Sequence, residues 1–394
     1  ACMSRLFQSH MQDADIGLIE GNKGLFDGIS TDGSDSNAAM ANLLGAPVVL
    51  VIDTRGITRG IAPLLHGYAT FDAEVEIAGV ILNQVGGSRH ESKLRNAVET
   101  YTDIPVLGAV GKSSDLVIDE RHLGLMPSNE HDEAQQVIAR IANAVAEGVD
   151  LDRLIAIAGT APEITPVPVT ADLPVADVKI GVAKDAAFGF YYAGDLQALR
   201  NAGAEIVWFD AINDATLPDV DALFIGGGFP ETLMGELEAN VAMRRGVAAF
   251  ADAGGVIYAE CGGLMYLCRS IRWGDRLCEM AGIIPADVVM DSRPQGRGYV
   301  RIEETPAHPW PRTAGEGALV PAHEFHYSHL EQVDPGLQFA YRMHRGHGID
   351  GENDGLVYKN VLAGYTHLRD IEGHHWAGRF VEHVRNCRVT NTRG

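Results

Sequence analysis

The segment VIYAECGGLMYL, residues 256–267, constrains this chain more than any other because it changes its expected local structure within one turn. An apolar, β-prone run reaches Cys261, two glycines follow, and Leu264, Met265 and Leu267 then recur at helical spacing. This order predicts a strand, a sharp turn with Cys261 at its apex, and a helix. Glycines let a substrate approach closely, and N–H groups at a helix start can hold an oxyanion and lower a thiol pKa. Cys261 is therefore a candidate nucleophile, and a buried structural cysteine is the alternative.

Length and composition indicate two domains and exclude several classes of partner. The chain has 394 residues, 46% of them hydrophobic, which is enough for a sizeable core in each of two domains. Its formal charge is -22, without a long run of one sign, which argues against a general affinity for nucleic acid or anionic membranes. An anionic substrate would therefore need a local cluster of basic side chains.

The cysteine spacing and the lack of a visible signal peptide suggest a reducing cytoplasm. The five cysteines, at positions 2, 261, 268, 278 and 387, show no CxxC or CxxH spacing, so neither a structural zinc site nor a disulfide framework is indicated. No apolar stretch reaches membrane-spanning length, and no signal peptide is visible. The chain starts at Ala1 in what reads as mid-helix over residues 3–11, so we expect the N-terminal segment of a longer protein to be missing.

Residues 15–160 alternate short apolar runs with amphipathic stretches, the pattern of a parallel sheet covered by helices on both faces. The predicted strands are 15–19, 47–52, 75–82 and 105–110, and the predicted helices are 37–44, 92–101 and 133–146. Residues 161–177 are rich in proline and read as an extended linker. An α/β pattern begins again at 178, with strands at 178–183, 205–209 and 222–225 and a helix at 191–202. The predicted organisation is a domain at 1–160, the linker, and a second α/β domain at 178–394.

A glycine loop lies about one βα unit before the Cys261 turn. The predicted strand 222–225 runs into GGGFPE, residues 226–231, so backbone N–H groups could face a developing oxyanion. A tight loop without a ligand is the alternative. The loop lacks GxGxxG spacing, so we reject a dinucleotide site.

A thiol nucleophile needs a base, and the best candidate is His367. It follows the apolar run VLAGYT, whose end would lie beside the other strand ends at the top of a parallel sheet. His323, His326 and His329 form a second cluster of candidate bases. Their spacing could also suit a metal, but a strand would place His323 and His326 on opposite faces.

Four motifs in order, GGGFPE, AECGGLMYL, HEFHYS and GYTHL, resemble the class I glutamine amidotransferase domain of the cobyrinic acid a,c-diamide synthase family. The resemblance implies that Cys261 takes the side-chain acyl group of glutamine and releases ammonia, with His367 as its base. Many class I amidotransferases carry an acid two residues after the histidine, where this chain has Arg369, so the third member is unassigned and a Cys–His dyad is predicted. The resemblance assigns the acyl-oxygen site to Gly227, Gly228 and Gly262.

The first domain carries the same resemblance independently. EGNKGLFDG at 20–28 resembles the family's EGxxGLFDG segment, RHLGL at 121–125 its RHLGL signature, and 47–59 its strand and following loop. The implied fold is P-loop NTPase-like, of the dethiobiotin synthetase type, with Glu20 holding Mg²⁺ beside the phosphates of ATP and Asn83 at the adenine-reading position. The implied carboxylate-binding residues are Lys23, Asp27, Arg55, Arg59, Arg121 and His122. For any one of these arginines, a surface ion pair is the alternative role.

The family's phosphate loop, GxxxxGK[ST] between a strand and a helix, is expected upstream of Ala1. The nearest internal match, residues 106–113, has Val106 where the first glycine belongs, and we read it as a chance match.

The resulting prediction is an ATP- and glutamine-dependent ligase that amidates the a and c acetates of cobyrinic or hydrogenobyrinic acid. Its partners would be L-glutamine and a polycarboxylate tetrapyrrole, and a homodimer is left open. Asn22 and Lys23 are polar where an apolar pair is expected, which raises sirohydrochlorin or siroheme as an alternative acceptor. An alternative of another class, prompted by the missing phosphate loop, is a stand-alone cysteine amidohydrolase or a non-catalytic binding module.

Overall fold

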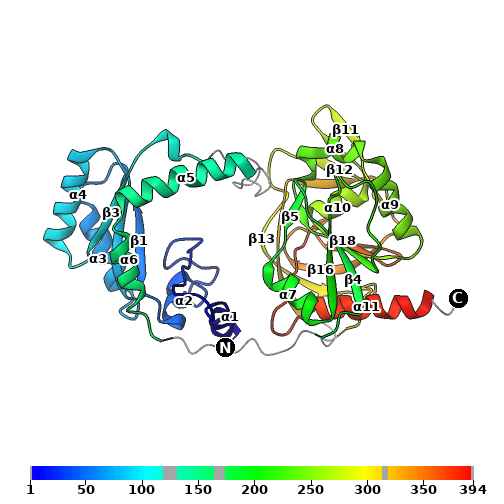
Figure 1. Ribbon diagram of the computed structural model, residues 1–394, viewed down its shortest axis with the longest axis horizontal. Helices are drawn as coiled ribbons and strands as arrows, with labels where there is room; N and C mark the ends of the chain where they lie inside the picture. Colours follow the sequence, from blue (N-terminus) through cyan, green and yellow to red (C-terminus); the bar gives the residue numbers. More distant parts are fainter. Residues whose placement is uncertain (1, 119–130, 164–173, 313–317, 392–394) are drawn as a thin grey trace. The chain divides into compact units, whose positions relative to one another are not determined.

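The computed structural model describes residues 2–118, 131–163, 174–312 and 318–391. Contacts divide it into two compact units, whose described parts end at residue 163 and begin at residue 174 (Figure 1). Arg121, His122 and most of the expected linker lie outside the described residues. Within the described helices, none is long and apolar enough to cross a bilayer.

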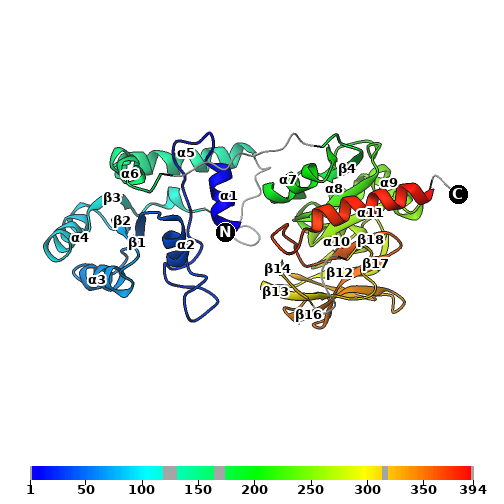
Figure 2. The same ribbon diagram turned by 90° about the horizontal axis from the view of Figure 1, so that it is seen from below.

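The first unit is built on a three-stranded parallel sheet in the order β1-β2-β3. Its strands are apolar on both faces because helices cover both, with α3 and α4 on one side and α5 and α6 on the other (Figures 1 and 2). The strands are β1 (Val48–Asp53), β2 (Ile77–Val85) and β3 (Val106–Gly111). The helices are α1 (Cys2–His10), α2 (Asn37–Leu44), α3 (Ile61–Phe71), α4 (Ser88–Tyr101), η1 (Ser114–Leu116), α5 (His131–Gly148) and α6 (Leu151–Ala158).

One predicted strand in this unit is wrong. Residues 15–19 form no strand, and Leu18 is 96% exposed. An apolar run becomes a strand only where a neighbour takes its backbone hydrogen bonds, and here the described residues supply none. The chance phosphate-loop match, by contrast, begins with β3, an ordinary sheet strand.

The second unit contains a nine-stranded sheet in the order β14-β13-β16-β17-β18-β9-β7-β4-β6 and a four-stranded sheet in the order β11-β10-β12-β15. In the larger sheet the five strands from β18 to β6 are parallel, and β14 to β17 extend it antiparallel. The strands are β4 (Val178–Ala183), β5 (Phe188–Phe190), β6 (Ala204–Phe209), β7 (Ala222–Ile225), β8 (Gly227–Gly228), β9 (Val256–Glu260), β10 (Cys268–Trp273), β11 (Arg276–Glu279), β12 (Ile284–Met290), β13 (Gly296–Glu304), β14 (Leu319–His326), β15 (Ser328–Glu331), β16 (Gln338–Arg345), β17 (Asn353–Tyr358) and β18 (Val361–Gly364). The helices are α7 (Ala193–Asn201), η2 (Pro230–Leu233), α8 (Met234–Ala239), α9 (Val241–Asp252), α10 (Gly262–Leu267) and α11 (Trp376–Asn391).

Side-chain alternation in the parallel strands explains why helices cover both faces of this sheet. Ile225 and Ile257 belong to the core cluster that also holds buried residues of α8, α9 and α10. Phe224 and Tyr258, one position along, belong to the cluster that contains residues of α7 and α11. Strands buried on both faces place their carboxyl ends along one edge, where functional groups can gather.

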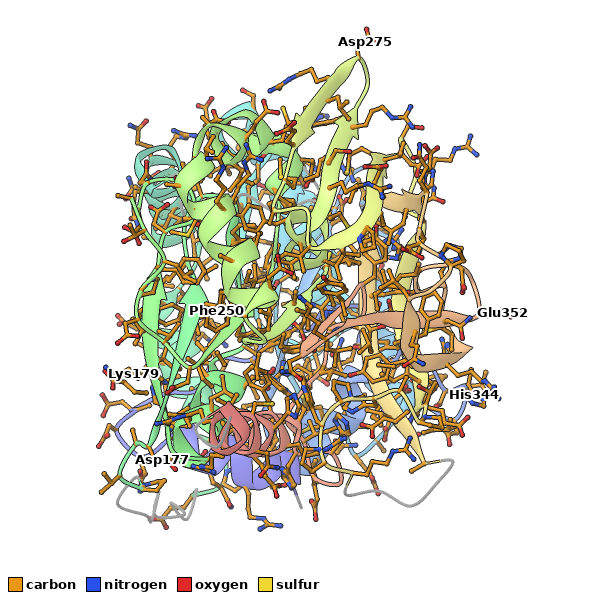
Figure 3. The ribbon with its side chains drawn as sticks, turned by 90° about the vertical axis from the view of Figure 1, so that its right-hand side faces the viewer. Asp177, Lys179, Phe250, Asp275, His344 and Glu352 are labelled. Atoms are coloured by element: carbon orange, nitrogen blue, oxygen red, sulfur yellow. The ribbon has the colours of Figure 1, made fainter. Side chains whose placement is uncertain are left out.

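Two peripheral features complete this unit. The hairpin of β10 and β11 projects from the smaller sheet with Asp275 at its tip (Figure 3). Asp177, just before β4, accepts hydrogen bonds from Arg385 of α11 at 2.6 and 2.8 Å. This pair fastens the C-terminal helix to the sheet.

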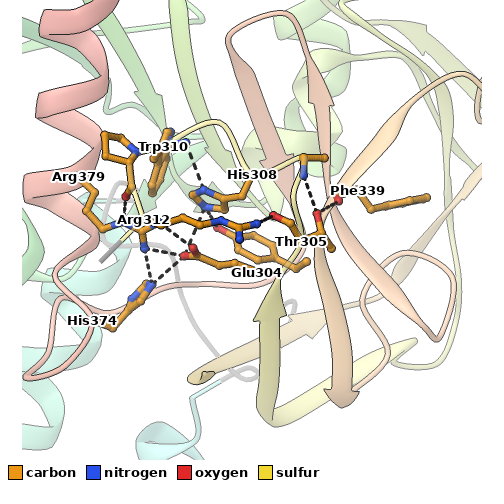
Figure 4. Close-up of polar contacts among 11 residues, drawn as sticks. Glu304, Thr305, His308, Trp310, Arg312, Phe339, His374 and Arg379 are labelled. Carbon is orange, nitrogen blue, oxygen red and sulfur yellow. Dashed lines mark hydrogen bonds and ion pairs between the residues drawn. The ribbon is translucent and has the colours of Figure 1, made fainter. Parts of the chain in front are cut away.

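A buried ion cluster fastens the other end of α11 (Figure 4). The guanidinium of Arg379, whose side chain is 3% exposed, donates to both carboxylate oxygens of Glu304 at 2.6 and 2.8 Å. Burial alone would raise the pKa of Glu304, but hydrogen bonds from His374 and Arg379 lower it to about 2. Glu304 is therefore ionised in the folded protein, and through Arg379 it ties α11 to β13.

Candidate active site

Cys261 lies at the apex of a sharp turn between β9 and α10, as the sequence predicts. Its backbone has φ 49° and ψ −101°, in the left-handed half of conformational space, which is costly for a residue with a side chain. Two backbone bonds hold the turn: the Cys261 N–H donates to Gly364 O at 2.7 Å, and its carbonyl accepts from Met265 N at 3.1 Å. The Cys261 side chain is buried just below the surface, since the residue is 8% exposed.

His367 comes to the same place from the neighbouring strand. β18 pairs in parallel with β9, so that Gly364 lies beside Glu260. Beyond that strand end, the backbone of His367 forms an antiparallel bridge with His323. Its Nδ1 lies 3.3 Å from Glu260 Oε2. The structure therefore brings the two predicted catalytic residues together at the carboxyl edge of the sheet.

The protonation of His367 follows from these neighbours. Burial by itself lowers the pKa of His367, but hydrogen bonds with the Cys261 thiol and the Glu260 carboxylate, and the charges of both groups, raise it to about 10. His367 is therefore protonated at neutral pH. The site therefore holds a proton donor next to the Cys261 sulfur.

The glycine loop lies against both residues. Gly227 and Gly228 form β8, which pairs with Phe190 and Phe188 of β5. A methyl group at Gly227 would lie 2.7 Å from His367 Cε1, and one at Gly262 would lie 3.0 Å from Gly228 N. Glycine is required here because loop, elbow and imidazole leave no room for a side chain. The loop therefore meets the imidazole at Gly227 and the residue after Cys261 at Gly228.

The three histidines in and just after the HEFHYS motif lie in three different environments. The ring of His323 stacks on that of His367 with centroids 4.8 Å apart and an interplanar angle of 11°, and His326 stacks on Tyr365. His329 pairs with Asp291 at 2.6 Å. No group of three metal-binding side chains is gathered anywhere in the described part of the chain.

Arg369, the departure from the common class I pattern, points toward α7. Its guanidinium carbon lies 3.6 Å from the ring centroid of Tyr192, and its Nε lies 3.5 Å from Asp195 Oδ1. From the sequence, His323 was predicted only as a member of a second histidine cluster, for the base or for a metal, and Glu260 was given no role, although both contact His367. A signal for Glu260 was present, since it directly precedes the nucleophile in the first motif.

Comparisons with known proteins match both units. The family model of the CobB/CobQ-like glutamine amidotransferase domain matches residues 179–371, and that of an AAA domain matches residues 2–119. The cobyrinate a,c-diamide synthase of Magnetococcus marinus is 43% identical over 378 residues, covering 94% of this chain and 80% of that protein. This chain belongs to the cobyrinate a,c-diamide synthase family.

Other family members match to a similar extent. The synthases of Methanosarcina acetivorans and Methanothermobacter thermautotrophicus are 40% and 41% identical, covering 96% and 94% of this chain and 80% and 81% of those proteins. Among solved structures, PurLQS from Thermotoga maritima superposes with a TM-score of 0.41 at 16% identity, covering 53% of this chain and 98% of that chain. An AAA domain is matched over residues 2–119, and this match does not bear out the expectation of a missing N-terminal segment.

The first unit places the predicted synthetase residues around its sheet and the loop at 20–28. Glu20, Lys23 and Asp27 are exposed on that loop. The loop is held to α2 by the Asn37 side chain, which donates to Lys23 O at 3.0 Å. Asn83, near the end of β2, lines a cavity of about 260 Å³ together with Gln84, Gly111 and Ser113.

The two described arginines of this set follow β1 and have partners within the protein. Arg55 forms an ion pair with Asp53 at 2.5 Å, and the Arg59 guanidinium lies 4.9 Å from the ring centroid of Tyr101. Arg55 therefore forms the surface ion pair that was the alternative role for a single arginine. Neither contact buries its charge, because both arginines are exposed.

Proposed function

We propose that this protein uses ATP and glutamine to amidate the a and c acetate side chains of cobyrinic or hydrogenobyrinic acid. The observation that carries the proposal is 37–43% identity with cobyrinate a,c-diamide synthases over at least 93% of the chain. These matches span both units, which does not favour a stand-alone amidohydrolase or a binding module. Siroheme-type acceptors are likewise not favoured.

In the proposed glutaminase step, Cys261 is the nucleophile and His367 moves the proton. The thiolate attacks the side-chain amide carbon of glutamine, and the amide oxygen becomes an oxyanion beside Gly227, Gly228 and Gly262. His367 gives its proton to the amide nitrogen, which leaves as ammonia while a glutamyl thioester remains on Cys261. Water then hydrolyses the thioester to glutamate, with His367 accepting a proton from that water and the thiolate leaving. The pKa of His367, raised to about 10, supports the first proton transfer because the donor is protonated at neutral pH.

In the proposed ligase step, a peripheral carboxylate of the macrocycle attacks the γ-phosphorus of ATP, which forms an acyl phosphate and ADP. Ammonia then displaces phosphate from the acyl carbon and yields the amide. We assign the adenine side of ATP to the cavity beside Asn83, whose side-chain amide could read a base edge. Glu20 is an exposed carboxylate. Mg²⁺ is usually bound by one or two carboxylates together with substrate phosphates, so Glu20 fits that ion. Bound Mg²⁺ would neutralise phosphate charge.

We also propose the domain boundaries of the sequence analysis, with the synthetase part at 1–160, a linker at 161–177 and the amidotransferase part at 178–394. Within the synthetase part, we assign the macrocycle carboxylates to the exposed charges of Lys23, Arg55 and Arg59, and we keep Asp27, on the same loop as Lys23, in the set. A protein of formal charge -22 needs such local cations to hold a polyanion. A macrocycle carboxylate would compete with Asp53 for the guanidinium of Arg55. Arg121 and His122 remain in the proposed set.

The test supplies the purified protein with Mg²⁺, ATP, glutamine and either cobyrinic acid, hydrogenobyrinic acid or sirohydrochlorin, and follows amide formation by mass spectrometry. We expect two amidations of a cobyrinic-type acid. Cys261→Ser should abolish glutamine hydrolysis and retain amidation from free ammonia. Amidation of sirohydrochlorin alone, or of no tetrapyrrole at all, would overturn the proposed acceptor, and surviving glutamine hydrolysis in Cys261→Ser would overturn the nucleophile.

A further inference from the structure

We propose that Glu260, the residue directly before the nucleophile, is the acid that orients His367 and completes the site as Cys261–His367–Glu260. The inference rests on the proposed function for the role of Cys261. It fills the position that Arg369 leaves open, with a carboxylate that comes from the strand before the nucleophile rather than from the segment after the histidine.

The carboxylate of Glu260 is held at both oxygens. Oε2 lies 3.3 Å from Nδ1 of His367. Oε1 accepts hydrogen bonds from the Tyr258 hydroxyl at 2.5 Å and from the Leu368 N–H at 2.9 Å. Glu260 is 3% exposed, so water does not compete for these bonds. A carboxylate fixed in this way can set both the orientation and the tautomer of the imidazole, which leaves Nε2 for the thiol.

Two backbone features let neighbours in sequence meet the same histidine. In a regular strand successive side chains point to opposite faces, so Tyr258 and Glu260 share a face of the sheet. By the same rule Cys261 would point to the other face, away from Glu260. The left-handed φ of 49° at Cys261 breaks that alternation and turns the thiol back toward the imidazole. The bond from Leu368 N–H to Glu260 then anchors the segment that carries His367.

The other acids near the site have different partners. Asp195 Oδ1 accepts from the Asp370 N–H at 3.0 Å and lies 3.5 Å from Arg369 Nε. Asp370 accepts from His375 at 3.0 Å and from the Ala377 N–H at 3.0 Å. The groups that face the His367 ring are Cys261, Glu260 and the stacked ring of His323, whose pKa is lowered to about 4 by burial and by repulsion from His367. His323 is therefore neutral, and Glu260 is the anionic partner on the Nδ1 side.

The decisive variant is Glu260→Gln, because its amide is forced into the wrong orientation. Tyr258 and Leu368 both donate to the Oε1 position, so the amide oxygen must take that place and the NH₂ group must face His367 Nδ1. A donor against Nδ1 opposes both the imidazolium and the required tautomer. Asp287→Asn is the matched control, since Asp287 is a partly buried acid of the smaller sheet that pairs with Arg269 at 2.6 Å.

Two readouts are compared in wild type, Glu260→Gln, Glu260→Asp and Asp287→Asn. The first is glutamine hydrolysis, for which Glu260→Gln should lower kcat by roughly 10²- to 10⁴-fold, with Glu260→Asp between it and wild type. The second is the pKa and tautomer of His367 from long-range ¹H–¹⁵N spectra of histidine-labelled protein, with the signal assigned by its loss in His367→Gln. Glu260→Gln should lower that pKa by at least about one unit, and Asp287→Asn should leave it unchanged.

The outcomes separate the two proposals. An unchanged His367 pKa in Glu260→Gln, or wild-type hydrolysis by that variant, overturns the role of Glu260. A lowered pKa in a protein whose wild type does not hydrolyse glutamine supports the contact between Glu260 and His367 and overturns the proposed function. Equal loss of kcat in Glu260→Gln and Asp287→Asn, with the His367 pKa unmoved in both, would show a structural effect only and also overturns the inference.

Discussion

Replacing Gly227 by alanine tests whether the glycine loop holds the imidazole in place. The new methyl group would lie 2.7 Å from His367 Cε1, whereas ordinary contact begins at 3.4 Å, so the ring would have to move by about 0.7 Å. The methyl group cannot retreat, because Phe190 Cβ lies 3.4 Å from it. The backbone cannot swing away easily either, since Gly227 pairs with Phe190 between β8 and β5. Gly227 is not among the positive-φ glycines, so the effect is steric.

A displacement approaching 1 Å in a catalytic group costs about 10²-fold in rate, so we expect kcat for glutamine hydrolysis to fall roughly 10- to 100-fold. Glutamate release measures this, and synthesis from free ammonia should be unaffected. The matched control is Gly378→Ala in α11, where nothing lies within 4 Å of the new methyl group. That change should stabilise the protein by about 0.5–1 kcal/mol and leave hydrolysis intact. Full glutaminase activity in Gly227→Ala would refute the placement of the loop against His367.

Three further substitutions test the described contacts. Glu304→Gln leaves the buried Arg379 charge without its partner and should cost about 3–5 kcal/mol in urea unfolding, while a loss below about 1 kcal/mol would contradict the cluster's role. The pKa of Glu304 in the folded protein, about 2, lies below the ordinary 4.5, so the stability that its ionised form contributes is complete above pH 4.5 and is lost as pH falls through 2. Glu304→Gln should not show this loss of stability at acid pH, and urea midpoints measured across pH would reveal the difference. Cys261→Ala should move the pKa of His367 from about 10 toward the ordinary 6.5 in histidine NMR titrations, and an unchanged value would show that the thiol does not contact the ring. Asn83→Ala should raise KM for ATP about tenfold without affecting glutamine hydrolysis; an unchanged KM would remove Asn83 from the nucleotide site.

The parallel strands could be predicted closely because burial on both faces leaves a continuous apolar run. β4 spans Val178–Ala183 and β7 spans Ala222–Ile225, which are the predicted limits. The same reasoning failed at residues 15–19, where Ile16 and Leu18 are exposed. Apolar composition describes what a strand can bury, but it does not supply the neighbour that a strand requires.

The antiparallel strands from β13 to β17 show no continuous apolar run in the sequence of the kind that marks the parallel strands. β14 alternates buried and partly exposed residues, and its buried positions include Glu324 and His326. Glu324 is accommodated because its carboxylate accepts the N–H groups of His347 and Gly348 at 2.7 and 2.8 Å. Those partners lie in a distant loop, so a polar residue at a core position could not be recognised as buried from the local pattern.

The site shows the same limit on a smaller scale. That Cys261 and His367 lie close together could be predicted because each follows an apolar strand in a specific motif, and parallel strand ends meet at one edge. Glu260 could not, because strand alternation places neighbouring side chains on opposite faces, and only the backbone angle at Cys261 removes that separation. Glu260 and Cys261 share one stretch of backbone, so covalent geometry fixes the separation of their Cα atoms, whereas His367 comes from another strand. The hydrogen bond from Leu368 N–H to Glu260 ties the segment after β18 to that backbone, so the alignment of the imidazole with both groups depends on this bond.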